Sequence, residues 1–155
     1  MGDSPRRVWA EYNAIDNVID VNLAGVEPSA PLVDEVVDEI IAVSRALPER
    51  VYVLVCWQGV VLDERVARRY SERLVDLAAH VRAMVRYATT DTSTRATIRA
   101  ETMKNRVQNS LALIFDSRAA AIEEIRSGAI DRVLRSTKPS PRPAAQTRLA
   151  QGRLR

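Results

Sequence analysis

The residues from 51 to 57 restrict the fold of this chain more than any other segment. They form an uninterrupted apolar run, VYVLVCW, rich in β-branched and aromatic side chains. Arg50 precedes the run, and the turn-forming pair Gln58 and Gly59 follows it. Successive side chains of a strand point to opposite faces of the sheet, so a strand without polar residues has to be covered on both faces. The run therefore predicts a central strand.

The segments around this run alternate between strand and helix patterns. Apolar and polar residues alternate at 7–12 and 18–24, which predicts a β-hairpin with one buried face. Apolar residues recur at helical spacing at 31–47, with Ser29 as N-cap and Pro31 in the first turn, and again at 63–80. Strands are also expected at 81–89 and 110–115, and a third helix from the capping residues 90–93 to about 106. A fourth helix is expected to begin after Asp116 or Ser117 as its cap and to end at Gly128 as its C-cap, or alternatively to extend through 130–135.

The resulting order of elements is β-β-α-β-α-β-α-β-α, and no internal repeat is evident. Strands that alternate with helices require right-handed crossovers, which predicts an α/β fold with a mainly parallel sheet and an antiparallel edge hairpin. We expect a disordered stretch at 1–6, one domain at 7–128, and a C-terminal extension at 129–155 that is basic and largely disordered from residue 136.

The excess of basic over acidic residues comes from the C-terminal end of the chain. The 155 residues include 23 Lys or Arg and 20 Asp or Glu, which gives a net charge of +3. Five of the bases and none of the acids lie in residues 136–155. Five charges spread over such a segment predict at most a weak, salt-sensitive contact with an anionic membrane or a nucleic acid. A flexible solubilising end explains them equally well.

The reactive residue types do not form a catalytic or metal-binding pattern. One Cys and one His cannot build a zinc site, and the five scattered glycines exclude a phosphate-binding glycine loop. Cys56 lies within the apolar run and is expected to be a buried hydrophobe, and His80 is expected to end a helix. No apolar stretch is long enough to span a bilayer or resembles a secretory signal. We expect a cytoplasmic protein that is not an enzyme and has no metal or cofactor.

The order of elements, the segment VYVLVCWQGVVLDERVARRY at 51–70 and the segment SLALIFDSRAAAIEEI at 110–125 resemble the STAS-type fold. The similarity extends from Arg7 to Ser127 and is specifically to the small bacterial SpoIIAA-like proteins. In the anti-sigma factor antagonists of this fold, the turn into the second helix carries Asp-Ser, and a partner kinase phosphorylates the serine. The resemblance therefore implies a non-enzymatic regulatory or scaffolding module.

Matched to that motif, Asp63 corresponds to the aspartate and Glu64 stands in place of the serine. The phosphoacceptor is missing, and Arg65, Val66 and Ala67 replace the small residues that usually follow. One carboxylate supplies less negative charge than a phosphoserine, which carries about −1.5 to −2. Glu64 is therefore at most a partial, permanent mimic. The simpler interpretation, which we favour, is that Asp63 and Glu64 stabilise the positive end of the helix dipole.

The leading hypothesis is that a protein partner, or a second copy of the chain, binds around the start of the second helix. Ligands and partners of open α/β sheets bind at the carboxyl ends of the strands, where Trp57 lies. An exposed Trp57 would anchor a partner, whereas a packed one would close the core, and we favour packing. The candidate partner-binding residues are Trp57, Gln58, Gly59, Asp63, Glu64, Arg65, Arg68 and Arg69.

The alternative hypothesis is a module for a small anionic or lipid ligand, because the wider fold also resembles the lipid-carrying Sec14-type domains. Cations and hydroxyl groups at a helix N-terminus can hold a phosphate or a lipid headgroup. Simple capping beside a solvated arginine face explains the same residues, and we favour that interpretation. The candidate anion-binding residues are Arg86, Thr92, Ser93, Arg95 and Arg99.

Overall fold

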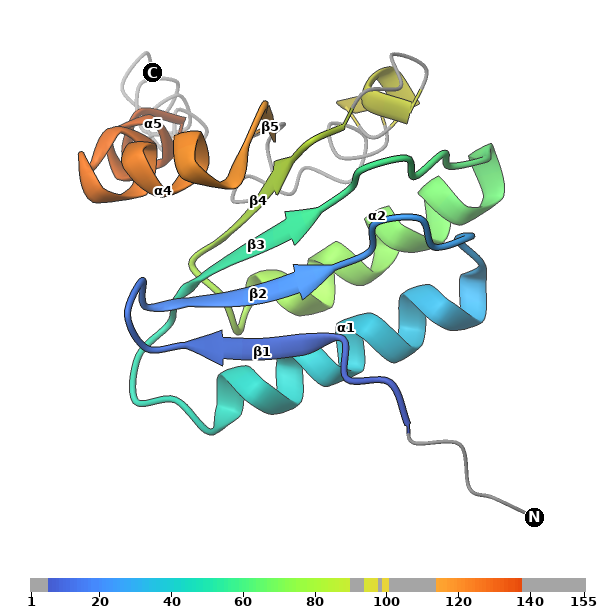
Figure 1. The fold of residues 1–155 in the computed structure, drawn as a ribbon, viewed down its shortest axis with the longest axis horizontal. Helices are drawn as coiled ribbons and strands as arrows, with labels where there is room; N and C mark the ends of the chain where they lie inside the picture. Colours follow the sequence, from blue (N-terminus) through green and yellow to red (C-terminus); the bar gives the residue numbers. More distant parts are fainter. Residues whose placement is uncertain (1–5, 90–93, 98, 101–113, 138–155) are drawn as a thin grey trace, which may run out of the picture.

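The computed structural model describes residues 6–89, 94–97, 99–100 and 114–137. Its five strands form one sheet in the order β1-β2-β3-β4-β5, in which β1 is antiparallel to β2 and the other neighbours are parallel (Figure 1). The predicted α/β class, mainly parallel sheet and antiparallel edge are confirmed. The elements are β1 Ala10–Asn13, β2 Val18–Asn22, α1 Ala30–Arg45, β3 Tyr52–Cys56, α2 Glu64–Ala78, β4 Ala83–Tyr87, β5 Ile114–Phe115, α4 Arg118–Arg126 and α5 Ala129–Thr137.

Strand β3 is buried on both faces, as its apolar sequence predicted. Val53 and Val55 belong to the larger apolar core, which α1 and α2 cover. Tyr52 and Leu54 point to the opposite face and belong to a smaller core together with Ile122 of α4. Figure 1 shows α4 and α5 on the side of the sheet away from α1 and α2.

Side chains just before the helices determine where three of them begin. The hydroxyl of Ser29 accepts a hydrogen bond from the Leu32 amide, at 3.2 Å, before α1, as predicted. Asp63 accepts one from the Val66 amide, at 2.8 Å, before α2. An N-cap residue is not helical itself, so α2 begins at Glu64 and not at Asp63 as expected. Ser117 caps α4 in the same way.

Two separate helices replace the expected fourth helix and its extension. Helix α4 ends at Arg126, Ser127 is its C-cap, and Gly128 follows with a φ of +76°. A glycine tolerates this left-handed conformation, so the chain changes direction and α5 begins at once. The expected domain boundary at 128 lies between these helices. Helix α5 nevertheless contributes Ile130, which is 2% exposed, to the smaller core.

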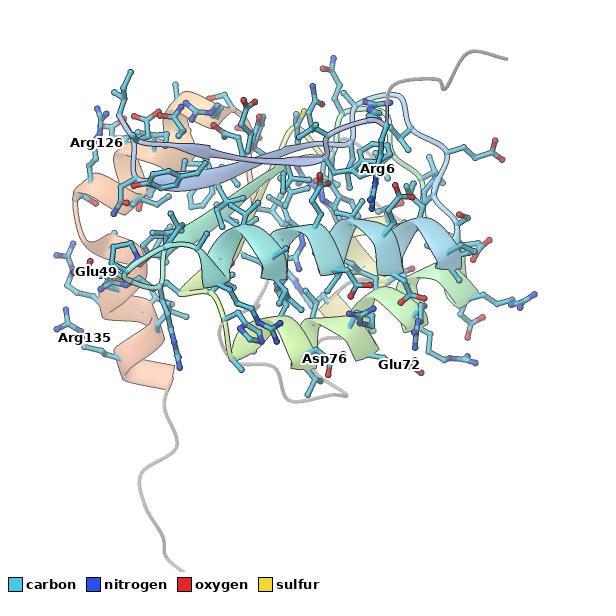
Figure 2. All side chains as sticks on the ribbon, turned by 90° about the horizontal axis from the view of Figure 1, so that it is seen from below. Arg6, Glu49, Glu72, Asp76, Arg126 and Arg135 are labelled. Atoms are coloured by element: carbon cyan, nitrogen blue, oxygen red, sulfur yellow. The ribbon has the colours of Figure 1, made fainter. Side chains whose placement is uncertain are left out.

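Ion pairs connect elements that are far apart in the sequence. Asp34 of α1 lies 2.8 Å from Arg69 and 2.9 Å from Arg73, both of α2. Figure 2 shows α1 and α2 side by side, with Glu72 and Asp76 on the outer side of α2. On the other face, Arg118 of α4 pairs with Asp16 and Asp20 of the hairpin, at 3.0 and 2.8 Å.

Replacing Asp34 by Asn is expected to reduce stability at neutral pH and to have progressively less effect in acid. Hydrogen bonds from Arg73 and Arg69 lower the pKa of the Asp34 carboxyl below its ordinary value, against the opposing effect of desolvation. A carboxyl whose pKa is lower in the folded chain stabilises the fold above its unfolded pKa, near 3.9, and this contribution is lost as the pH falls through the folded pKa. Urea unfolding of both proteins between pH 7 and pH 3 measures the difference.

The matched control is Glu49→Gln, because Glu49 is exposed and pairs with no base in the described part of the chain. Its effect on stability is expected to be small at every pH. A difference between wild type and Asp34→Asn that stayed constant down to pH 3 would contradict the role of the Asp34 ion pairs.

Candidate functional site

Two loops lie side by side where β2 and β3 end. The amide of Leu23 donates to the Cys56 carbonyl at 3.1 Å, and that of Gly25 donates to the Gln58 carbonyl at 3.0 Å, so the pairing of the two strands continues into the loops. Each loop makes a tight turn around a glycine with positive φ, +69° at Gly25 and +72° at Gly59. In these turns, the third residue has the conformation that glycine adopts most easily.

The two loops are equivalent parts of a repeated strand–turn–helix unit. Val18 of β2 pairs with Tyr52 of β3, and the same register continues to the two helix starts, each directly after its capping residue. The sequences of the two loops share a short pattern, LAGV at 23–26 and WQGV at 57–60, each followed after two residues by a capping Ser or Asp. Little else in the paired segments is similar, so the equivalence is one of geometry.

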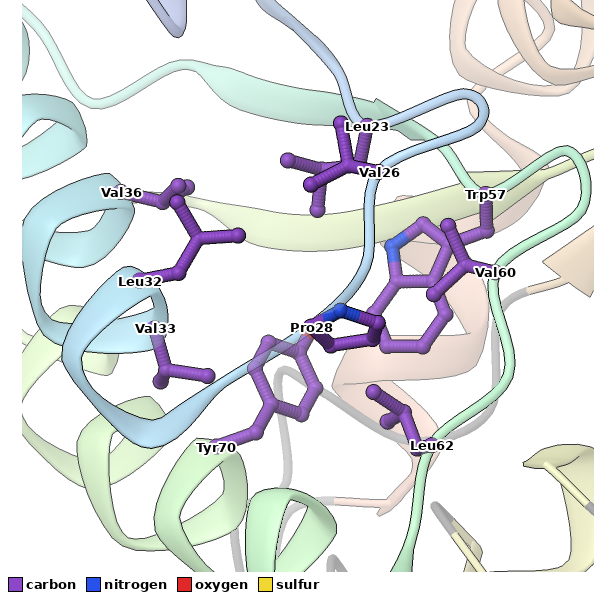
Figure 3. Close-up of a pocket in the computed structure, with 10 residues that line it drawn as sticks. All are labelled: Leu23, Val26, Pro28, Leu32, Val33, Val36, Trp57, Val60, Leu62 and Tyr70. Atoms are coloured by element: carbon purple, nitrogen blue, oxygen red, sulfur yellow. The ribbon is translucent and has the colours of Figure 1, made fainter.

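A small cavity lies beneath the two loops (Figure 3). Its volume is about 40 Å³, and its surface is almost entirely apolar. The β2–α1 loop, the start of α1, the β3–α2 loop and one residue of α2 line it. These residues are Leu23, Val26, Pro28, Leu32, Val33, Val36, Trp57, Val60, Leu62 and Tyr70.

Trp57 is buried next to this cavity, as we expected. Its side chain is 2% exposed and meets Tyr70 edge to face, with 5.3 Å between the ring centroids. The indole nitrogen Nε1 has no hydrogen-bond partner among the described residues. Although Trp57 was a candidate contact residue, its ring lies below the surface and presents no anchor to a partner. An unpaired buried donor is uncommon in a folded protein and requires an explanation.

Arg86, at the carboxyl end of β4, lies beneath these aromatic rings and is 0% exposed. Its Nε and Nη2 donate to the Tyr70 hydroxyl at 3.1 and 2.9 Å, and its guanidinium lies 5.9 Å from the centroid of Trp57. A buried arginine needs acceptors, because desolvation of its charge is costly. Arg86 is therefore part of the core and is not exposed to a ligand in solution.

The structure describes only two of the other candidate anion-binding residues, Arg95 and Arg99. Arg95 donates from Nε to the Thr89 carbonyl at 2.8 Å, and Arg99 is exposed. Thr92 and Ser93 lie outside the described residues. The basic segment 136–155 is also outside them, apart from Ser136 and Thr137 at the end of α5.

Several candidate partner-binding residues share an exposed patch around the start of α2. Glu64 and Arg68 form a weak pair at 3.4 Å, with 78% and 53% of their side chains exposed. Arg65 is exposed and forms no ion pair with any described residue. Arg69 is directed away, because it pairs with Asp34 of α1. Sequence analysis missed Val61, which is 61% exposed. All three residues from 60 to 62 are apolar, so the sequence contains no signal that separates the exposed Val61 from the buried Val60 and Leu62.

Two further titratable groups, Cys56 and Tyr87, lie at the carboxyl ends of β3 and β4. Cys56 is free and buried, as expected. Burial and the adjacent Cys56 raise the pKa of Tyr87 to about 12, so its phenol stays protonated at neutral pH. Among the described residues, no three His, Cys, Asp or Glu side chains are grouped to hold a metal ion. No described helix is both long and apolar enough to cross a membrane.

Comparison of the chain with models of protein families, with curated proteins and with solved structures finds no match. The resemblance to the SpoIIAA-like proteins therefore stays a prediction.

Replacing Tyr70 by Phe is expected to lower the free energy of unfolding by about 1.5–3 kcal/mol, the range for a hydrogen bond to a charged group. The variant keeps the ring against Trp57 and removes an acceptor from the buried Arg86. Chemical denaturation measures the change. The control is Tyr12→Phe, because the exposed hydroxyl of Tyr12 donates to Asn17. This variant should change the free energy of unfolding by no more than about 0.5 kcal/mol. If both variants changed the free energy of unfolding equally, the Tyr70 hydroxyl would not stabilise the buried charge of Arg86.

Proposed function

We propose that this chain is a non-enzymatic, cytoplasmic regulatory or scaffolding module that binds a protein partner through the surface at the start of α2. This α2-start surface consists of Gln58, Gly59, Val61, Glu64, Arg65 and Arg68. The observation that carries the proposal is the exposure of Val61, which is apolar and 61% exposed. Arg65, four residues further along, is also exposed and pairs with no acid among the residues that the structure describes.

The backbone that carries Val61 is held from three sides, which supports a binding role for it. The turn at Gly59 closes through a 3.0 Å bond from the Val60 amide to the Trp57 carbonyl. The Leu62 amide donates to the buried hydroxyl of Thr94 at 3.1 Å. Asp63 then caps α2. A surface whose backbone is already ordered loses less conformational entropy when a partner binds.

The chemistry of the surface defines the partner that it fits. Val61 suits an apolar contact, and Arg65 suits a carboxylate at its edge, because an arginine without an internal partner gains most from a new one. Glu64 and Arg68 already offset each other at 3.4 Å. We infer a partner surface with an apolar centre and at least one acidic side chain. STAS-like architecture and a lost phosphoacceptor at Glu64 are consistent with such a module, which would bind without being switched by phosphorylation.

The test is affinity capture from the cells of origin with the full chain and with Val61→Asp and Arg65→Glu. Val61→Asp places an unpaired charge in the centre of the interface, and Arg65→Glu repels an acidic side chain of the partner. Both variants are therefore expected to reduce the captured amount of a specific partner by about tenfold or more. Quantitative mass spectrometry of the captured proteins measures the change.

The matched control is Val75→Asp, because Val75 is 52% exposed on the same helix, away from its start. It carries the same substitution and should retain the partner. Retention of every specific partner by Val61→Asp, in a variant that is folded by circular dichroism, would refute the proposed surface.

A further inference from the structure

The amino ends of the parallel strands meet at one edge of the sheet, opposite the two glycine turns. Tyr52, the first residue of β3, is paired with Val18 of β2 and with Ala83 of β4. The β1–β2 turn and the loops that precede β3 and β4 therefore lie at the same edge. Helix α5 is joined to this edge, because Asp131 pairs with Arg82 at 3.0 Å. Together they form one end of the molecule, on the left in Figures 1 and 2.

The β1–β2 turn presents an isoleucine on an ordered backbone at this end. Ile15 is 91% exposed, the highest value among the large apolar residues that the structure describes. The side chain of Asn13 accepts hydrogen bonds from the Ile15 and Asp16 amides, at 3.0 and 3.1 Å. Asp16 in turn pairs with Arg118 and Arg126 of α4, at 3.0 and 2.7 Å. Because these contacts already order the turn, Ile15 can enter an apolar environment with little further loss of conformational entropy.

Basic residues are concentrated at this end and in the chain that follows α5. Of the 23 bases and 20 acids, 11 bases and 5 acids lie in the segments 14–17, 45–51, 79–82 and 123–155. The remainder of the chain has more acids than bases. Figure 2 shows Arg126, Glu49 and Arg135 along this end. The exposed arginines here that pair with no acid in the described part of the chain are Arg45, Arg50, Arg132 and Arg135.

An isoleucine among arginines fits the surface of an anionic bilayer better than it fits a nucleic acid. Phosphates of a nucleic acid would pair with the arginines but would offer the protruding Ile15 no apolar contact. A bilayer provides anionic headgroups for the bases and, just below them, an apolar layer for the isoleucine. The bases are also distributed over several segments, which suits an extended anionic plane. No described helix can span a membrane, so such a contact would be peripheral.

We propose that this end of the molecule binds an anionic lipid bilayer, with Ile15 inserted at the level of the headgroups and the surrounding arginines paired with lipid phosphates and carboxylates. This amino-end surface consists of Ile15, Arg50, Arg126, Arg132 and Arg135. It lies at the opposite ends of the strands from the α2-start surface, so a partner at one surface leaves the other accessible. The two proposals are independent, and either can fail without the other.

The test is co-sedimentation of the full-length chain with vesicles of phosphatidylcholine that contain about one quarter phosphatidylserine. Vesicles of phosphatidylcholine alone are the comparison. The chain is expected to bind the anionic vesicles, to bind the neutral ones at least about tenfold more weakly, and to dissociate as the salt concentration rises.

Two substitutions separate the apolar and the electrostatic contributions. Ile15→Asp removes the inserted side chain and adds a negative charge, so the partition onto anionic vesicles should fall by about tenfold or more. Ile15→Ser removes the apolar side chain alone and should cause a smaller loss. Arg132→Glu changes the charge by two, and each basic charge near an anionic surface is worth about fivefold, so its partition should also fall by about tenfold or more.

Matched controls carry the same substitutions elsewhere on the molecule. Val75→Asp changes a valine that is 52% exposed on α2, and Arg6→Glu changes an exposed arginine that Figure 2 shows away from this end. Both should bind the anionic vesicles like the wild type, and circular dichroism checks that every variant is folded.

Three results would each overturn the proposal. The first is absent binding to anionic vesicles, or equal binding to both kinds of vesicle. The second is undiminished binding of both Ile15→Asp and Arg132→Glu, which would assign the contact to residues 138–155 alone. The third is tighter binding of duplex DNA than of vesicles, unaffected by Ile15→Asp, which would identify this end as a nucleic-acid surface.

Discussion

The burial of β3 on both faces is the constraint on which the rest of the structure depends. Tyr52, Leu54 and the other residues of this strand cannot face water without exposing apolar surface, so layers must cover both sides of the sheet. Helices α1 and α2 cover one side, and α4 and α5 cover the other. Parallel neighbours on both edges of β3 follow from the same requirement, because the crossover helices between them supply the covering layer.

The in-register pairing of β2 with β3 explains why the candidate site is at one edge of the sheet. Two strands that end at the same level place their loops next to each other, and bonds between Leu23, Cys56, Gly25 and Gln58 hold the loops together. The helices then begin at equivalent positions, after Ser29 and Asp63. This arrangement leaves a space between the two helix starts and the two turns, and Trp57 closes the inner side of that space.

The same segment, residues 57–65, contributes to two features of different chemistry. Alternation along an extended chain directs Val60 and Leu62 inward to the cavity and Val61 outward to the α2-start surface. The inner side chains line an apolar cavity, whereas the outer side chain is exposed. One short loop therefore both closes the core and forms part of the surface that we propose for partner binding.

Local patterns in the sequence were sufficient for most of the architecture. The apolar run at 51–57, the spacing of apolar residues at 31–47 and the capping residues Ser29 and Ser117 act over a few residues, so they predicted a strand covered on both faces and the starts of α1 and α4. Asp63 was expected in the first turn of α2 and is its N-cap. The burial of Trp57 was expected because large aromatic side chains are usually buried. The bounds shifted by a few residues, because strand ends depend on the partner strand and not on local propensity.

Only the tertiary structure decided where the side chains with chemistry lie. Arg86 was a candidate for anion binding from its place at a strand end, but packing of α2 brings Tyr70 over it and converts it into a core residue. Arg69 was a candidate contact residue, but Asp34 of α1 turns it away from the start of α2. The unpaired nitrogen of Trp57 and its cavity arise from four segments that meet in space. The sequence determined most of the apolar residues that are buried, because their burial follows local periodicity. Long-range contacts determined the burial of Arg86 and what each buried polar group faces, because hydrogen-bond partners depend on how distant elements pack.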